Sequence, residues 1–310
     1  MVVMKRKVVQ VGPTTLMVSL PQKWAQHCGI RKGHEIDVIE EGNTLILGAS
    51  IQPKLKEITI TIPSKEEYLG RLITAPYIKG YDMIHLKYKD GSVYSKILET
   101  TKLLIGFEIV ENTAQSCTLS NISTTPEEKF DVLLRRLFAN NVMFAKDLLS
   151  RIEKSEDVQD LMEYERNINR IHLFCRRVLQ TNKASSTVYT PLSLYMIVLH
   201  LEECADCLKH IVTLLNNQPA AGLGKLQAPT KELLLDCIRL QEILFKVFGK
   251  ILNGENITSQ ISFIHEHKKV RDKVMNNIEY YRGNALNSAI CGRLLGLVDL
   301  SFHITEELFD

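Results

Sequence analysis

The start of the chain concentrates positive charge. Residues 1–34 contain no aspartate or glutamate, and acidic residues begin only at Glu35. The basic residues in this stretch are Lys5, Arg6, Lys7, Lys23, Arg31 and Lys32. Clustered cations of this kind can bind the phosphates of nucleic acid, and the affinity grows with each phosphate that is neutralised. The cluster indicates a DNA-binding surface, although ordinary solvated side chains on strands and turns would give the same pattern.

A second candidate site is a pair of carboxylates on one expected helix. Glu202 and Asp206 are four residues apart, so they stack on one helix face and both can reach a single cation. The apolar stripe of that helix includes Leu201 and Leu208, and the two acids lie off it. The pair indicates either a weakly bound divalent or ferric metal or a solvated acidic face.

No catalytic constellation is present among the remaining residues. The sequence has no glycine-rich phosphate loop, no Gly-x-Ser-x-Gly and no His-Glu-x-x-His motif. His200, Cys204, Cys207 and His210 have the residue types of a zinc site. They line one helical ridge, which cannot close a tetrahedron around zinc. We therefore expect a protein that is not an enzyme.

The composition indicates an ordinary globular chain. Its 310 residues, 45% hydrophobic and 24% charged, suit two or three domains and exclude a disordered chain. The net charge of +2 is too small to imply nucleic-acid binding by itself. Seven cysteines, an odd number, form no disulfide framework. The longest apolar stretch, 192–201, is about half a membrane span. We expect a soluble, cytoplasmic protein without membrane insertion.

Residues 1–53 form the first expected domain. Apolar residues predict short strands in the segments 8–11, 16–20, 36–38 and 45–47. Pro21 can open a helix that Gly29 ends. So few residues in such short strands bury little surface. We expect this domain to form a homodimer, in which a second copy completes the fold.

Residues 54–124 alternate strand and helix signals. They predict a small α+β domain of β-α-β-α-β-β order, although the sequence does not fix which strands pair. The strands are expected at 58–62, 81–88, 107–111 and 117–122, and the helices from 64 to about 80 and over 93–105. The first helix begins with a capping box, Ser64 followed by Glu67.

Residues 125–310 are helical throughout. Thr125-Pro126 is a helix start, and apolar residues then recur at three- and four-residue intervals. Further helices are expected near 156–180, 190–216, 230–253, 257–281 and 284–309. A loop rich in glycine and proline separates two sets of three helices, 125–216 and 229–310. We expect an all-α bundle of two three-helix repeats in a multidomain α+β protein.

The N-terminal domain resembles a known family. Its segments 16–21 (LMVSLP), 29–38 (GIRKGHEIDV) and 45–47 (LIL) follow the order and spacing of the AbrB/SpoVT/MazE family. The resemblance implies a swapped-hairpin β-barrel homodimer that binds DNA. Arg6 and Lys7 match a basic pair early in the family's first strand, whereas the arginines common in its short helix are Ala25 and Gln26 here.

The helical domain resembles the PhoU family of phosphate-uptake regulators. Segment 201–206 (LEECAD) follows that family's Leu-Glu-x-x-x-Asp signature on the third helix. The resemblance implies a metal at Glu202 and Asp206. The second repeat has Val298 and Phe302 at the matching positions, with Asp299 and His303 displaced by one residue. The family also implies protein partners, such as the phosphate transporter's ATPase or another phosphate-signalling protein.

Together the two resemblances predict a dimeric DNA-binding transcriptional regulator of phosphate uptake and homeostasis. In this interpretation the bundle senses phosphate status or binds a partner protein. The alternative is a PhoU-like signalling adaptor or architectural protein that uses residues 1–53 only to dimerise. The missing arginines at Ala25 and Gln26 favour the alternative, because base reading usually relies on guanidinium groups.

Overall fold

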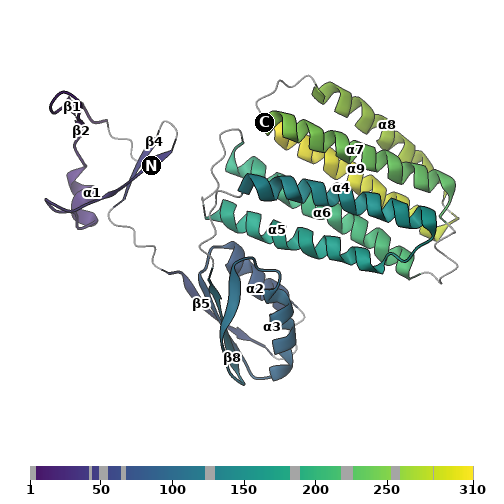
Figure 1. Cartoon of the computed structure of the whole chain (residues 1–310), viewed down its shortest axis with the longest axis horizontal. Coiled ribbons are helices and arrows are strands. Elements are labelled where there is room, and N and C mark those ends of the chain that lie inside the picture. Colours follow the sequence, from purple (N-terminus) through teal and green to yellow (C-terminus); the bar gives the residue numbers. More distant parts are fainter. Residues whose placement is uncertain are drawn as a thin grey trace. The chain divides into compact units, whose positions relative to one another are not determined.

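The computed structural model is mixed α+β, as the sequence predicts (Figure 1). It describes residues 5–41, 44–48, 55–63, 68–122, 130–181, 189–217, 226–252, 259–281 and 283–309. The chain separates into two compact units, Met1–Leu55 and Lys56–Asp310. The expected domain boundary after residue 53 thus lies close to the division between the units.

The first unit contains two antiparallel hairpins and a short helix. β1 (Val8–Gln10) pairs with β2 (Leu16–Val18), and β3 (Asp37–Glu41) pairs with β4 (Thr44–Gly48). Between the hairpins lies α1 (Gln22–His27), which ends where Gly29 adopts a left-handed conformation with φ of 68°. The expected strands and helix are present. The two hairpins are separate sheets, so the chain alone closes no barrel over its described residues.

The described residues of this unit form no buried hydrophobic core. Val8 is 62% exposed, Leu16 70% and Leu45 65%, although all three lie on strands. No residue of α1 is buried. Side chains of this type are normally inside a folded domain, so the apolar surface of the unit lacks the cover that a second protein surface would give.

The second unit begins with a four-stranded sheet and two helices. Their order along the chain is β5 (Glu57–Ile62), α2 (Leu69–Ile78), β6 (Met83–Tyr88), α3 (Tyr94–Thr101), β7 (Phe107–Asn112) and β8 (Ser116–Asn121). This confirms the predicted β-α-β-α-β-β order. In the sheet the order is β5-β6-β8-β7, with β5 and β6 parallel and the other pairs antiparallel. The capping box Ser64–Glu67 lies outside the described residues.

Alternation of side chains decides which face of this sheet is covered. On β6, Ile84, Leu86 and Tyr88 are buried, whereas Lys87 between them is exposed. The buried set packs with residues of α2 and α3, such as Ile73, and Figure 1 shows both helices on the same side of the sheet. A strand buried on one face only gives this period-two pattern.

Six helices follow in the described part of the chain. They are α4 (Phe130–Lys154), α5 (Met162–Gln180), α6 (Pro191–Asn216), α7 (Ala228–Leu252), α8 (Ser259–Tyr280) and α9 (Ala285–Phe309). Within each successive set of three, all the helices contact one another. The sets join where α6 packs along α9 and α4 along α7. The predicted helices are thus present, although the predicted start at Thr125 lies outside the described residues.

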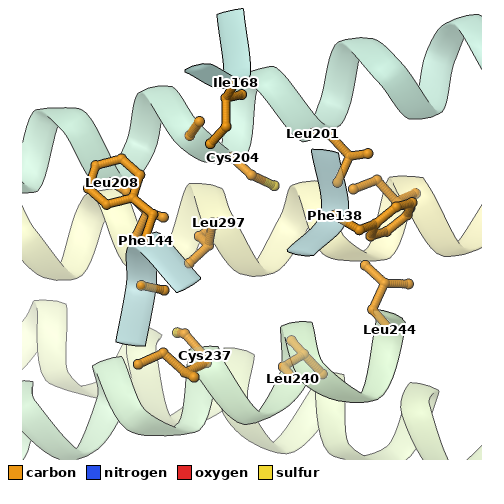
Figure 2. Close-up of a cluster of buried hydrophobic side chains, with 14 of the residues drawn as sticks. Phe138, Phe144, Ile168, Leu201, Cys204, Leu208, Cys237, Leu240, Leu244 and Leu297 are labelled. Atoms are coloured by element: carbon orange, nitrogen blue, oxygen red, sulfur yellow. The ribbon is translucent and has the colours of Figure 1, made fainter. Parts of the chain in front are cut away.

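The bundle has one continuous core. Figure 2 shows side chains of α4, α5, α6, α7 and α9 meeting in it, among them Phe144, Ile168, Leu208 and Leu297. The rings of Phe138 and Phe248 stack with centroids 4.4 Å apart and join α4 to α7. Each buried leucine or phenylalanine contributes about 1.5–3 kcal/mol, so the core fixes the positions of the polar groups on the helices.

Arg177 of α5 joins the bundle to the sheet domain. Its Nη1 donates hydrogen bonds to the carbonyl oxygens of Tyr77 and Tyr81, each at 2.7 Å. Its guanidinium also lies 5.0 Å from the ring centroid of Phe107. Beside it, a Cβ on Gly80 would lie 2.4 Å from Cγ2 of Thr181, so only glycine permits this approach. The sheet domain and the bundle therefore form one unit.

One described helix, α9, is long and apolar enough by length and composition to span a membrane. In the structure it packs against α6, α7 and α8. Its Leu294, Leu297 and Val298 are buried in the bundle core. A helix buried in a protein core is apolar in the same way as a helix that spans a membrane.

Candidate nucleic-acid interface and metal position

The predicted DNA-binding residues lie on the first unit. Lys5, Arg6 and Lys7 precede β1, Lys23 is on α1, and Arg31 and Lys32 are in the turn after that helix. All six side chains are exposed. None forms an ion pair with an acidic residue in the described part of the chain. Their charges are therefore available to a ligand, and phosphate oxygens suit both lysine and arginine.

The predicted metal pair lies between α5 and α6, where it is less exposed than expected. Glu202 and Asp206 are both half-buried, although the sequence indicated a face opposite the core. Burial raises the pKa of Glu202 to about 7, and the negative charges of Asp206 and Glu165 add to the rise. The carboxyl group of Glu202 therefore titrates near neutral pH.

A lysine already neutralises this acidic group. Nζ of Lys209 lies 2.7 Å from Oε1 of Glu165 and 3.3 Å from Oδ1 of Asp206. Glu165 is only 7% exposed, and it also accepts a hydrogen bond of 2.6 Å from Nδ2 of Asn169. The site is thus a cluster of three carboxylates, Glu165, Glu202 and Asp206, around one ammonium group.

Sequence reasoning missed Glu165 and Lys209. The available signals were their helical spacings, since Glu165 precedes Asn169 by four residues and Lys209 follows Asp206 by three. What the sequence does not show is that α5 and α6 bring them together. No group of three or more His, Cys, Asp or Glu residues among the described positions is arranged to hold a metal ion. A cation at Glu202 and Asp206 would compete with the ammonium group of Lys209 for the carboxylate of Asp206.

In the second set of three helices, Asp299 has an arginine beside it. Nε of Arg271 lies 3.0 Å from Oδ1 of Asp299. These two residues line a cavity of about 360 Å³ with His267, Phe302 and His303. Nε2 of His267 is buried without a hydrogen-bond partner. A guanidinium group beside the one carboxylate opposes a bound cation.

The cysteines are free thiols. All seven are unpaired, as expected from their number. Burial raises the pKa of Cys207 to about 11, and Cys204 is fully buried in the core. Without a bound metal, both thiols therefore stay protonated at neutral pH. The burial of Cys204 confirms the expectation that this cysteine is part of the core.

Searches against protein-family models, curated proteins and solved structures gave no match.

Proposed function

We propose that this chain is a homodimeric DNA-binding transcriptional regulator of phosphate uptake and homeostasis. The proposal is carried by one observation: six exposed cations without described acidic partners lie in a separate unit whose described residues form no buried core. Charge without a partner suits a polyanionic ligand, and an uncovered apolar surface suits a second subunit.

Dimerisation would produce the DNA-binding form. A second copy of the first unit covers side chains such as Leu16 and Leu45, in the manner of the swapped-hairpin barrel that the resemblance to AbrB implies. The same step doubles the cations that can face one duplex. Because each neutralised phosphate releases counterions, the dimer binds DNA more tightly and with a steeper dependence on salt than a monomer.

The bundle supplies the sensory or partner-binding part of the proposal. Its link to phosphate rests on the resemblance of segment 201–206 to the PhoU signature. The half-buried Glu202, with its pKa near 7, gives that segment a group whose charge responds to its surroundings. Partners of this surface would be the phosphate transporter's ATPase or another phosphate-signalling protein.

The test is a filter-binding salt series with the full chain and duplex DNA. Replacing Arg6 and Lys7 by alanine should weaken binding to all sequences and lower the salt slope by about one unit for each phosphate that is no longer neutralised. The matched control replaces Lys246 and Lys250, two exposed lysines of α7, and should leave both quantities unchanged. Equal affinity of the Arg6/Lys7 variant and the wild type would contradict the assignment.

The alternative, a signalling adaptor, makes a different prediction in the same assay. It expects a dimer that shows no salt-dependent retention of DNA. Chromatin immunoprecipitation with sequencing, in phosphate-replete and phosphate-starved cells, then separates the two. Enrichment at specific genomic sites that changes with phosphate supports the regulator, and absence of any enrichment supports the adaptor.

A further inference from the structure

The sheet domain has an open edge at β7. In the order β5-β6-β8-β7, this strand pairs with β8 on one side and with no described strand on the other. An open edge offers backbone hydrogen-bonding groups to any extended chain that lies beside it. A bulge between Ile109 and Glu111 interrupts the ladder with β8, so the longer regular stretch of the strand is Phe107–Ile109.

A groove of about 830 Å³ runs along this edge. One wall is formed by Ile109 and Val110 of β7 and by Gly106, which precedes the strand. The other wall is the outer face of α3. Tyr94, Leu98 and Thr101 line the helix wall at four- and three-residue spacing. Leu98 is 41% exposed and Val110 47%. The groove therefore presents apolar surface directly beside the open strand edge.

Positive charge marks one part of the groove. Lys102, at the end of α3, and Arg170 of α5 both line it. Both side chains are exposed, and neither forms an ion pair with an acidic residue of the described chain. A carboxylate in the groove would find two unpaired donors here. Two carboxylates, Glu108 and Glu111, also line the groove. Glu108 alternates with the buried Phe107 and so belongs to the other face of the sheet, and Glu111 accepts a hydrogen bond of 3.3 Å from Oγ1 of Thr118.

We propose that this groove binds an extended peptide segment of a partner protein, which adds to the sheet as a strand beside β7. Side chains of the peptide then alternate, as in any strand. One set is apolar and packs over Leu98 of α3. The other set lies on the sheet face of Glu108 and is polar or basic. An acidic residue or a terminal carboxylate lies near Lys102 and Arg170.

A second copy of the same strand fits the edge less well. Two antiparallel β7 strands related by a two-fold axis between Ile109 and Val110 place Glu108 of each opposite Glu111 of the other. Like charges directly opposite each other destabilise a strand pair. The acidic residues thus disfavour self-association in this register, while the unpaired Lys102 and Arg170 favour a carboxylate-bearing partner.

The experiment selects peptides from a displayed random library with free carboxyl ends, about twelve residues long, to span a typical strand. The full-length protein is the target, and the best peptide is then measured by fluorescence anisotropy. We expect alternating apolar residues and an acidic end. Replacing Lys102 and Arg170 by glutamate should weaken binding about tenfold or more. The matched control replaces Lys87 and Lys89, two exposed lysines of the same domain, and should bind like the wild type.

Two measurements keep the test independent of any folding defect in the variants. Alternate backbone amides of the bound peptide face β7, and the amides between them face away. N-methylation of the amides that face β7 should abolish binding, whereas N-methylation of the other set should leave binding unchanged. Hydrogen exchange of the wild type should slow in residues 106–109 when the peptide is added. Failure to enrich any peptide, equal binding by the Lys102/Arg170 variant, or unchanged exchange at β7 would overturn the proposal.

Discussion

Lys209 is the residue that limits cation binding at Glu202 and Asp206. Its ammonium group contacts both Glu165 and Asp206, and Asp206 is one of the two carboxylates at which the sequence predicts a metal ion. A metal cation bound to the same carboxylate would be repelled by the positive charge of the lysine. Removing the lysine leaves the buried carboxylate of Glu165 without its counter-charge, which destabilises the folded chain. Metal binding therefore competes with an existing ion pair.

We predict only weak metal binding at Glu202 and Asp206 and none at Asp299 of α9. Elemental analysis of protein purified without chelator should show substoichiometric metal, lower still in the Glu202→Ala, Asp206→Ala double variant. Lys209→Gln should bind Mn²⁺ more tightly than the wild type does. Chelator should leave the thermal unfolding of the wild type unchanged. Two or more tightly held metals per chain, or a sharp fall in Tm with chelator, would contradict this prediction.

The same cluster makes stability depend on pH. Burial raises the pKa of Glu202 from 4.5 to about 7, so between these values the folded protein holds a proton that the unfolded chain has released. The contribution of this carboxyl group to the free energy of unfolding is fully present below its pKa in the unfolded chain. It is lost as pH rises through its pKa in the folded protein.

We expect the loss to be about 1–2 kcal/mol, after discounting the shift for the partial exposure of this carboxyl group. Urea unfolding at about pH 5 and about pH 8 measures it, because these values bracket the titration. Glu202→Gln should fall less in stability over this range than the wild type. Glu232→Gln, at an exposed glutamate of α7, is the control and should behave like the wild type. An undiminished fall in Glu202→Gln would rule out this origin.

At the scale of elements, the sequence alone predicts individual helices and strands, but it does not predict the contacts between distant elements. Alternation over β5 and β6 and the apolar periodicity of α4 are properties of consecutive residues, so the sequence alone predicts these elements. The pairing β6-β8 and the contact of Arg177 with Tyr77 join residues far apart in the chain. Arg177 resembles an ordinary helix-surface residue until the sheet domain lies against α5.

Arg177→Met should loosen the sheet domain from α5. It removes the hydrogen bonds to the carbonyl oxygens of Tyr77 and Tyr81 and the 3.3 Å ion pair with Asp82. We expect a loss of about 2–4 kcal/mol in unfolding free energy, since the acceptors stay behind unsatisfied.

Arg177→Lys should recover only part of that loss, because an ammonium group cannot contact both carbonyls in the planar geometry of guanidinium. Hydrogen exchange should increase in residues 76–82 of the methionine variant. The control is Arg166→Met, at an exposed arginine of the same helix. Equal stability of Arg177→Met and the wild type would show that the junction does not depend on this side chain.

At the scale of the whole molecule, the two candidate sites differ in how well the sequence predicts them. The basic cluster needs no partner residue, so its charge is visible in residues 1–34 directly. The carboxylate cluster depends on the packing of α5 against α6, which brings Glu165 and Lys209 to Asp206. A site made by one segment can be recognised in a sequence, whereas a site shared by two helices depends on how those helices pack.

The exposed apolar surface of the first unit predicts the oligomeric state of the protein. Leu16 and Leu45 are 70% and 65% exposed on opposite hairpins, and a unit of this size buries too little surface to be stable alone. We predict a homodimer with its interface in residues 1–53. Light scattering of the full-length wild type at micromolar concentration should give the mass of a dimer.

Replacing Leu16 and Leu45 by aspartate should convert this dimer to a monomer, because charged groups in an apolar interface are costly to desolvate. The control is Leu192→Asp, which makes the same leucine-to-aspartate change in the other unit, at a residue of α6 that is 71% exposed. This variant should stay dimeric. If DNA binding depends on two copies of the basic cluster, the monomeric variant should also have a salt slope about half that of the wild type, since it neutralises about half as many phosphates. A monomeric wild type, or a Leu16/Leu45 variant that remains a dimer, would place the interface elsewhere.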